Sequence, residues 1–304
     1  MGVLKRRRHF LMRRSTVLSL ASRVRSAGLC LAVLAAMIVA RSVDPPPIEA
    51  VRLAAFDGFQ RMAPRDYHPA PVRVVDIDEE SLRRIGQWPW PRRKVASLID
   101  RLGGMGPAAI GLDMVFPEAD RTSPARLRPD LAAAGLVPPN GGADWPDYDA
   151  ELADAIARNP VVTSFGLIGR PTAATPALKA GVALIGTDPA SAIRRYAGAV
   201  SNLPALEAAA AGNGSFSVVS ESDRVIRRMP LLAVLGDRIY PSLALETLRV
   251  AQGAGSLAIK SLDAGRAFDV GGGVASVRAG RVQADTTPDG HVWLRYAGDV
   301  PERS

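Results

Sequence analysis

The fold is decided by the run VRVVDIDEESLRRIGQWPWPRRKVASLIDRLGGMGPAAIGLDMVF, residues 72–116. Its first part, Val72–Ile77, is apolar and β-branched, which favours a buried strand. A short helix over about 79–85, a turn of Gly, Pro and Trp, and a helix reaching about Leu102 follow. Glycines end that helix, and Ala108–Phe116 has the pattern of a second buried strand. This order predicts a right-handed βαβ unit in a covered parallel sheet.

The chain after this unit continues the α/β pattern and then becomes rich in strands. Residues 117–144 are rich in Pro, Arg and Gly and indicate a long excursion or lid. Beyond it we expect a helix over 147–158, a strand over 161–167, a helix over 203–211, a strand over 215–219, a hairpin over 225–240 that turns at Gly236-Asp237, and a helix after the cap Ser242. From Ser256 to Tyr296 short alternating strands such as Val292–Tyr296 are expected. We predict one α/β domain with a parallel sheet core and a β-rich C-terminal portion.

The positive charge of the chain is concentrated at its N-terminus. The 304 residues include 38 Lys and Arg against 30 Asp and Glu, a formal charge of +8. Eight bases precede position 26 without any acid: Lys5, Arg6, Arg7, Arg8, Arg13, Arg14, Arg23 and Arg25. Subtracting these eight leaves 30 bases against 30 acids, so the body is formally neutral. A neutral body with 5% aromatic residues argues against nucleic acid as a partner.

The basic head is followed by the apolar run SAGLCLAVLAAMIVA, Ser26–Ala40. As a helix it would span about 22 Å, which is short of the roughly 30 Å hydrocarbon layer. It suits either a cleaved signal peptide or an uncleaved signal anchor over residues 26–43. Ala40-Arg41-Ser42 is a poor cleavage site, which favours the anchor. Because the bases precede the run, we expect residues 1–25 in the cytoplasm and the body outside it.

A second apolar pattern follows a Pro-rich spacer. Ile48–Met62 places its apolar residues near one helical face, and we expect that face to pack in the core of the exported part rather than to lie on a membrane. The single cysteine, Cys30, lies in the apolar run, so the folded body contains no thiol for a disulfide or a metal.

Carboxylates follow both strands of the predicted βαβ unit. Asp76 and Asp78 come at the end of the first strand and Asp113 near the end of the second. The carboxyl edge of such a sheet is where ligands bind. These groups could hold a divalent cation, bind a cationic ligand, or pair with Arg92 or Arg93. The alternative is that they cap the following helices and accept hydrogen bonds from turn amides.

Trp88 and Trp90 alternate with prolines and suit either a ligand platform or a buried turn. The candidate ligand-binding residues are therefore Asp76, Asp78, Trp88, Trp90, Arg92 and Asp113, and Asp76, Asp78 and Asp113 are the alternative metal site. The three histidines, His9, His68 and His291, are far apart in sequence and make no catalytic or zinc motif. We assign no catalytic residue and no cofactor.

Two blocks closely resemble one sensor family. VVDIDEESLRRIGQWPWPRRKVASLIDRL, residues 74–102, and AAIGLDMVFPEAD, residues 108–120, resemble the type-two CHASE domain, an extracytoplasmic sensory module of bacterial cyclases and histidine kinases. Further matching segments are PDYDAELADAIARNPVV at 146–162, RVIRRMPLL at 224–232, YPSLALETLR at 240–249 and PDGHVWLRYAG at 288–298. The chain departs from the family pattern at Asp223-Arg224, where an Asp-Gly turn is expected.

The resemblance implies a receptor in the bacterial cytoplasmic membrane. Its parts would be a cytoplasmic N-terminus, one span over residues 26–43, and an exported ligand-sensing domain over 48–304. Returning spans and an output module, typically a nucleotide cyclase or a kinase, usually follow. The chain reaches Ser304 without a second apolar run, so a fragment or truncated product without the output module is expected.

The expected partners are the lipid bilayer, an unknown extracytoplasmic ligand and a possible homodimer partner. Two other classes stay open at this point. One is an exported carboxylate-based metal-binding or hydrolytic α/β protein, and the other is an exported interaction scaffold without a sensing role.

Overall fold

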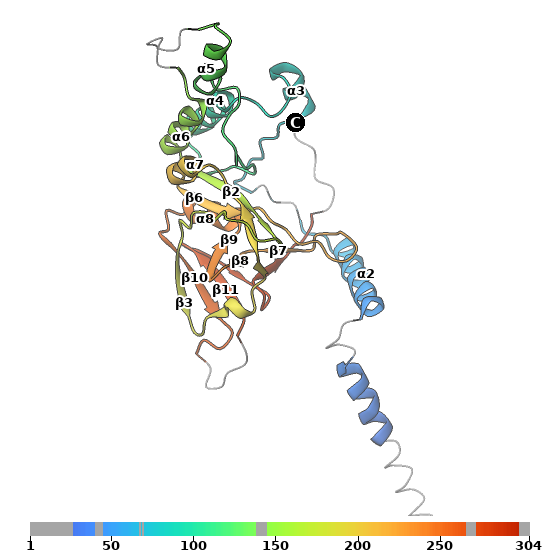
Figure 1. Ribbon diagram of the computed structural model, residues 1–304. Helices are drawn as coiled ribbons and strands as arrows, with labels where there is room; N and C mark the ends of the chain where they lie inside the picture. The colour runs from blue at the N-terminus through green and yellow to red at the C-terminus, as the bar shows by residue number, and fades with distance from the viewer. Residues whose placement is uncertain are drawn as a thin grey trace, which may run out of the picture. The chain divides into compact units, whose positions relative to one another are not determined.

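The computed structural model describes residues 27–39, 45–66, 68, 70–137, 145–265 and 272–297. These fall into two units, of which the first contains the described residues up to Ala70 together with 295–297, and the second is Pro71–Leu294 (Figure 1). The helices are a helix over 27–39, α2 (Pro46–Met62), α3 (Glu79–Ile85), α4 (Arg92–Gly103), α5 (Pro124–Ala133), α6 (Tyr148–Arg158), η1 (Pro189–Ser191), α7 (Pro204–Ala209) and α8 (Leu243–Ala251). The strands are β1 (Ile110–Gly111), β2 (Val161–Ile168), β3 (Gly181–Ile185), β4 (Arg195–Tyr196), β5 (Gly198–Val200), β6 (Gly212–Ser215), β7 (Arg228–Pro230), β8 (Leu232–Leu235), β9 (Arg238–Pro241), β10 (Ser256–Ser261), β11 (Val274–Ala279), β12 (Val282–Asp285) and β13 (His291–Trp293).

The first unit is mainly helical. The predicted anchor over 26–43 is described only over 27–39, where it is helical, and the predicted basic head over 1–25 lies outside the described residues. Among the residues that the structure describes, no helix is both long and apolar enough to cross a membrane.

Helix α2 confirms the helix predicted over 48–62 and begins slightly earlier, at Pro46, because proline is well accommodated in a first helical turn. Leu53 is its buried residue, whereas Val51 and Phe59 are largely exposed. The predicted burial of the whole apolar face is therefore wrong.

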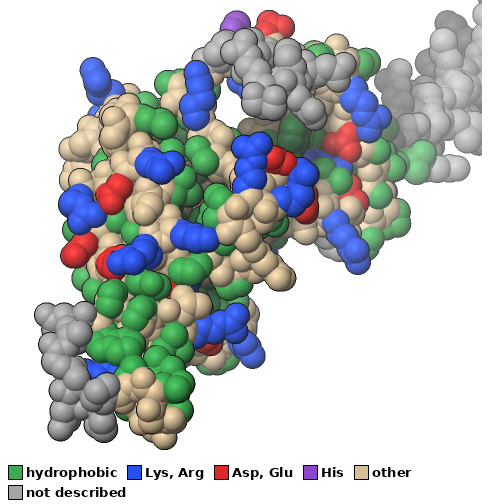
Figure 2. Space-filling model, turned by 90° about the horizontal axis from the view of Figure 1, so that it is seen from above, with side chains coloured by type: hydrophobic (Ala, Val, Ile, Leu, Met, Phe, Trp, Pro, Cys, Tyr) green, Lys and Arg blue, Asp and Glu red, His purple; other side chains and the backbone are tan. Residues whose placement is uncertain are grey.

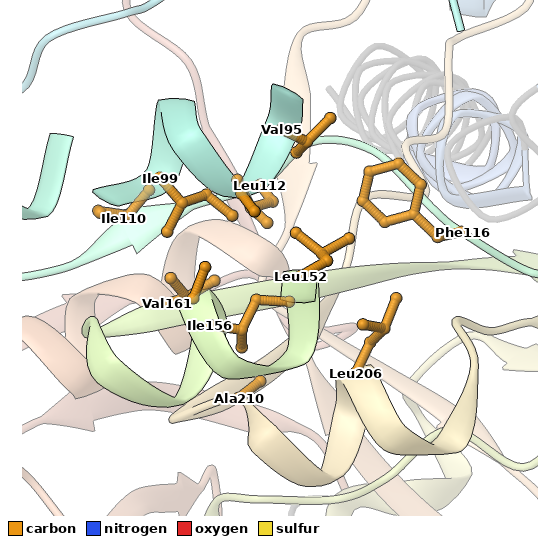
Figure 3. Packing of buried hydrophobic residues seen from close by; sticks show 12 residues of the cluster. Val95, Ile99, Ile110, Leu112, Phe116, Leu152, Ile156, Val161, Leu206 and Ala210 are labelled. Carbon is orange, nitrogen blue, oxygen red and sulfur yellow. The ribbon is translucent and has the colours of Figure 1, made fainter. Parts of the chain in front are cut away.

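The helical end of the second unit is formed by α4, α6 and α7, which pack around β1 and the start of β2 (Figure 1). Val95 and Ile99 on α4 are four residues apart, as are Leu152 and Ile156 on α6, so each pair lies on one helical face. Figure 3 shows these side chains pointing toward one another in the first core cluster. The predicted amphipathic helices at these positions are confirmed, and α4 ends at Gly103 as expected.

A small mixed sheet is centred on β2. Strand β2 is buried along almost its whole length, as predicted, although its sequence VVTSFGLI includes the polar residues Thr163 and Ser164. It pairs in parallel with β1, Ile110 opposite Val161, and with β6, Val162 opposite Gly212. Its last residues pair with β5 in the antiparallel sense. The predicted parallel sheet core is thus confirmed around β2.

The first strand of the predicted βαβ unit is absent. Val72–Ile77 forms no strand, and Val72, Val74 and Val75 are 68%, 88% and 55% exposed. β-branched residues favour extended backbone, but a strand also needs a neighbouring strand for its backbone hydrogen bonds, and among the described residues no strand pairs with this segment. The second strand, predicted over 108–116, is reduced to Ile110–Gly111, although the Leu112 amide also donates to Val162 O.

The β-rich C-terminal portion is confirmed. Strand β10 pairs with β11 in the antiparallel sense and with β3 in parallel, and β11 also pairs with β12. The predicted hairpin is shorter than expected and consists of β8 and β9, with its turn at Gly236-Asp237 as predicted. Strand β7 pairs instead with β13, which replaces the strand predicted over 292–296.

Two other predicted elements have different bounds. The strand expected over 215–219 lies earlier, at Gly212–Ser215, and the helix before it ends at Ala209. Gly212 is required there because a Cβ would lie 2.9 Å from the Glu246 side chain. The excursion over 117–144 contains helix α5, which its Pro-rich sequence did not predict.

A tight turn occurs at Asp223-Arg224 without the glycine of the family pattern. The Arg224 amide donates to Glu221 O, and the Glu221 amide donates to Val225 O. Arg224 has a φ of 66°, the left-handed conformation that usually takes glycine at this position of a three-residue loop. The departure in sequence therefore changes the strain of the turn and not its presence.

Charge is spread over the face of the molecule that Figure 2 shows. Seen from above, Lys and Arg side chains lie among uncharged and hydrophobic residues, with Asp and Glu beside several of them (Figure 2). This face carries no single basic stripe of the kind that binds nucleic acid.

Candidate functional site

The three predicted carboxylates do not converge. Asp76, Asp78 and Asp113 are all exposed. Asp78 caps α3: its Oδ1 accepts a hydrogen bond from the Ser81 amide at 2.8 Å, and this bond lowers the pKa of Asp78. Within the described ranges, no three His, Cys, Asp or Glu side chains are grouped so that they could hold a metal ion. The helix-capping alternative is thus confirmed for Asp78.

The two tryptophans of the turn before α4 face inward. Their rings lie 5.7 Å apart in an edge-on arrangement. Trp90 is 5% exposed and its Nε1 donates to Gly86 O at 2.6 Å, while Trp88 packs against the first core cluster. This arrangement corresponds to the buried turn rather than to an open stacking platform.

Arg92 lies in a polar cluster at the start of α4, with its side chain 12% exposed. Its amide donates to Asp120 Oδ2 at 2.7 Å, and its guanidinium lies 4.1 Å from the Phe116 ring centre. Burial lowers the pKa of Arg92, although the charges of Asp120 and Asp149 oppose that shift. Its Nε lies 3.8 Å from Asp149 Oδ1, too far for a hydrogen bond, and neither atom has a hydrogen-bond partner among the described residues.

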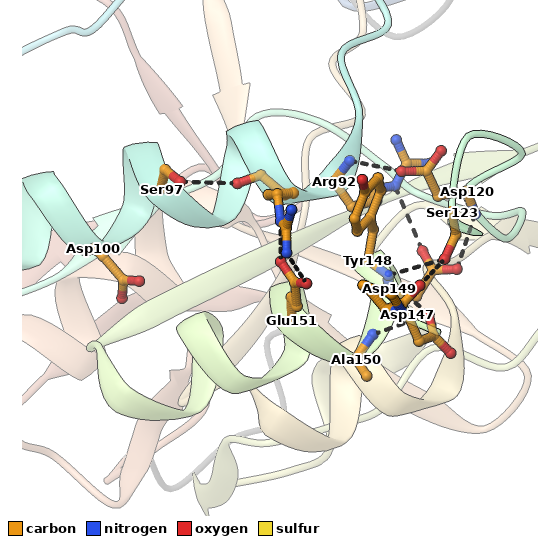
Figure 4. Close-up of polar contacts among 12 residues, drawn as sticks. Arg92, Ser97, Asp100, Asp120, Ser123, Asp147, Tyr148, Asp149, Ala150 and Glu151 are labelled. Atoms are coloured by element: carbon orange, nitrogen blue, oxygen red, sulfur yellow. Dashed lines mark hydrogen bonds and ion pairs between the residues drawn. The ribbon is translucent and has the colours of Figure 1, made fainter. Parts of the chain in front are cut away.

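The same cluster joins α4, α6 and the segment between β1 and α5 (Figure 4). Asp120 accepts from the Arg92 amide and from Thr122, and its own amide donates to Asp149 Oδ2. Burial raises the pKa of Asp120, but these hydrogen bonds and the charge of Arg92 outweigh it and leave that pKa below its ordinary value. Beside it, Arg93 donates twice to Glu151 at 2.8 Å. These contacts fix α4 and α6 to the segment between β1 and α5. Ligand binding by the six residues chosen from the sequence stays a prediction.

A cleft of about 680 Å³ lies elsewhere, beside α7. One wall is residues 173–177, which we call the cleft segment, and another is residues 199–203, which comprise the end of β5 and the residues that follow it. Pro117 and one side of α7 complete the lining. Its volume falls in the range of about 300–1,000 Å³ that is usual for small-molecule sites.

Three buried polar side chains from different elements hold the cleft segment. Tyr240 of β9 donates from its hydroxyl to Pro176 O at 3.2 Å, and burial raises the pKa of that hydroxyl. The Ala177 amide donates to Glu207 Oε2 of α7 at 2.7 Å. Asn213 of β6 donates from Nδ2 to Ala177 O at 3.0 Å. The wall of the cleft is therefore a positioned structure, although it has no secondary structure of its own.

Asn202 connects the cleft to the sheet. Its Oδ1 accepts from the Phe116 amide at 2.8 Å and its Nδ2 donates to Ser164 O at 2.7 Å. Its own amide donates to Glu207 Oε1 at 3.3 Å. Both side chains are about 5% exposed. Asn202 therefore links Glu207, through hydrogen bonds, to Phe116 in the chain after β1.

Sequence reasoning missed the cleft because its residues come from separate parts of the chain. One local signal was present: Glu207 is the only charged residue in LPALEAAAA, residues 203–211. A carboxylate in such an apolar run is buried only when partners are provided. Its partners, the amides of Ala177 and Asn202, cannot be inferred from that run.

A comparison with protein-family models matches the CHASE2 domain over residues 30–304. The chain belongs to the CHASE2 domain family, which comprises extracytoplasmic sensory domains. The resemblance predicted from the sequence blocks is confirmed, and a sensory role outside the cytoplasm follows for the bulk of the chain. Neither the curated proteins nor the solved structures gave a match.

Proposed function

We propose that this chain is the ligand-sensing part of a bacterial membrane receptor, held at the outer face of the cytoplasmic membrane by residues 26–43. The observation that carries the proposal is the CHASE2 match, which spans nearly the whole described body. The charge distribution supports it, because the eight bases before position 26 favour a cytoplasmic N-terminus and an exported body.

In the proposed mechanism the sensory domain has two conformations, and a ligand that binds one of them more tightly shifts the population toward it. The receptor would pass this shift across the membrane to an output module, for which we propose a nucleotide cyclase with a kinase as the alternative. A homodimer of the sensory domain is part of the proposal, since two copies held in one membrane could change their packing together.

A topology reporter tests the placement. An enzyme that is active only outside the cytoplasm, fused after Ser304, should be active, whereas a reporter that works only in the cytoplasm should be silent. A matched variant with Arg6, Arg7, Arg8, Arg13 and Arg14 changed to Gln should export less of the fusion, because the charge asymmetry is reduced. Strong activity of the cytoplasmic reporter on the unaltered chain would contradict the proposal.

A further inference from the structure

The cleft beside α7 contains one charged side chain, and that side chain is buried. Among the described residues that line the cleft, Glu207 is the only acid or base, and it is 5% exposed. The remaining lining is mostly small and apolar, with Ala173, Val200 and Leu203 as examples, and the hydroxyls of Thr175 and Ser201 add polar groups. A ligand therefore meets a largely apolar surface with a single negative charge.

The charge of Glu207 has no cationic partner in the part of the chain that the structure describes. Its two oxygens accept hydrogen bonds from the amides of Ala177 and Asn202, at 2.7 and 3.3 Å. Lys179 is a base of the same region, but its Nζ donates to Ala208 O at 2.9 Å. A buried carboxylate is unfavourable unless it is paired or hydrogen-bonded, and among the described residues Glu207 is stabilised by hydrogen bonds and its place in the first turn of α7, without a counter-ion.

The remaining acceptor capacity of Glu207 defines the chemistry of the ligand. A carboxylate offers about four acceptor sites, of which the two amides occupy two. A primary ammonium group carries three donors and a full positive charge, and hydrogen bonds between ionised groups are the stronger ones. We propose that the cleft binds a small organic ammonium ion, with its cation at Glu207 and its apolar body along the alanine, valine and leucine side chains.

This inference deepens the proposed sensory function and rests on it for its biological meaning. The carboxylate that would receive the ammonium also holds the cleft segment through Ala177 and the chain after β1 through Asn202. Occupation of the cleft would therefore compete with or reinforce contacts that position two other parts of the domain. That coupling is what a ligand-dependent population shift requires.

Calorimetric titration of the full 304-residue chain in detergent tests the proposal with three probes of nearly equal shape. These are 3-methylbutylamine, 3-methylbutan-1-ol and 3-methylbutanoate, which carry charges of +1, 0 and −1 at pH 7. We expect saturable binding of the amine, at least tenfold tighter than that of the alcohol, and none of the carboxylate. Equal affinity for the amine and the alcohol, or no saturable binding of the amine, would overturn the proposal.

Two variants and a control locate the binding. Glu207→Gln should weaken amine binding at least tenfold, because it removes the charge. Ala173→Phe should weaken binding as well, because Ala173 is an exposed lining residue and a larger side chain there takes space from the cleft while Glu207 itself is unchanged. Glu79→Gln, at an exposed position on α3, should bind as the unaltered chain does. If Glu207→Gln does not fold, unchanged amine binding by Ala173→Phe still refutes the site. The topology reporter tests the proposed sensory placement independently of ligand binding, so failure of one proposal can be told from failure of the other.

Discussion

At the scale of single residues, Arg224 is the non-glycine residue with positive φ in the described chain, at 66°. A side chain costs about 1–2 kcal/mol in this conformation, whereas glycine adopts it freely but loses about 0.5–1 kcal/mol through its greater unfolded-state freedom. We therefore expect Arg224→Gly to raise the free energy of unfolding by about 0.5–1 kcal/mol. Denaturant unfolding of the full chain measures this gain.

The control for Arg224→Gly is Arg224→Ala, which removes the guanidinium and keeps the Cβ. Arg224→Ala should give no gain, because the Cβ is what makes the left-handed conformation unfavourable. An equal gain in both variants would show that the charge of Arg224, and not its backbone, destabilises the turn.

Asp223 gives the protein a specific dependence on acid. Arg227 donates to both oxygens of Asp223, at 2.9 and 2.6 Å, and these bonds lower the pKa of Asp223 from 3.8 to about 2. The carboxyl group is thus more acidic in the folded state, so the ionised pair stabilises the fold above its unfolded pKa. That contribution is lost as the pH falls from about 4 to about 2.

The expected result is that Asp223→Asn lowers the melting temperature at pH 7 and flattens its decline between pH 4 and pH 2. Part of the decline should persist, because hydrogen bonds from Ser261 and Thr187 also lower the pKa of Asp263 to about 2. Asp154→Asn, at an exposed position on α6, serves as the control and should keep the full decline. The same flattening in both variants would rule out the Asp223 pair as the cause.

Residues whose function is local were predictable and residues whose function depends on distant partners were not. Helix capping was one of two interpretations for Asp78, beside a ligand site, and the cap that forms is local, because Ser81, whose amide donates to it, is three positions away. Glu207 was not assigned a function because its partners, Ala177 and Asn202, reach it through the folded chain. Trp90 was left with two interpretations, since only packing distinguishes a platform from a buried turn.

At the scale of elements, α8 contains a buried ion pair. Arg249 donates to Glu246 from Nε at 2.8 Å and from Nη2 at 2.7 Å, and the two side chains are 8% and 0% exposed. Removing one partner leaves the other as an unpaired buried charge, which destabilises a fold by about 3–5 kcal/mol. We expect a loss of this size from Glu246→Ala in denaturant unfolding, and a loss from the Glu246→Ala, Arg249→Ala double variant that is well below the sum of the single losses.

The matched control for α8 is the exposed pair of Glu80 and Arg83 on α3, which has the same spacing along its helix. Exposed pairs are screened by water and contribute about 0–1 kcal/mol, so Glu80→Ala should change stability by no more than that. A loss of similar size in Glu246→Ala and Glu80→Ala would mean that burial does not decide the contribution of these pairs.

Helices were predicted better than strands for a physical reason. Helices α4, α6 and α8 have apolar residues at helical spacing, and α6 and α8 also have side-chain caps, so their local sequences contain the stabilising contacts. Strand pairing joins distant segments: β6 and β13 are displaced from their predicted positions, and Val72–Ile77 has strand composition but pairs with no strand in the described part of the chain. Local propensity is therefore a weak guide where non-local pairing decides the structure.

At the scale of the whole molecule, the three buried clusters all lie within the second unit. Their buried members fall between Val95 and Ala279, whereas Leu53 is the buried apolar residue of the first unit among the described ones. A unit with its own core should fold alone. We therefore expect a chain limited to Pro71–Leu294 to be soluble and to unfold cooperatively, with a melting temperature within about 4 °C of the full chain, a difference equivalent to about 1 kcal/mol for a domain of this size.

Trp90→Ala within Pro71–Leu294 serves as the comparison, because it shows by how much the melting temperature falls when core packing is lost. Trp90 is 5% exposed, and truncating a buried tryptophan costs about 3–5 kcal/mol, so the melting temperature should fall by roughly 6–20 °C. The two results together show which unit contributes the stability. If the melting temperature changes little when the first unit is removed and falls strongly when one core side chain is removed, the stability resides in Pro71–Leu294. If removing the first unit lowered the melting temperature as much as Trp90→Ala does, residues before Pro71 or after Leu294 would have to contribute to the folded core.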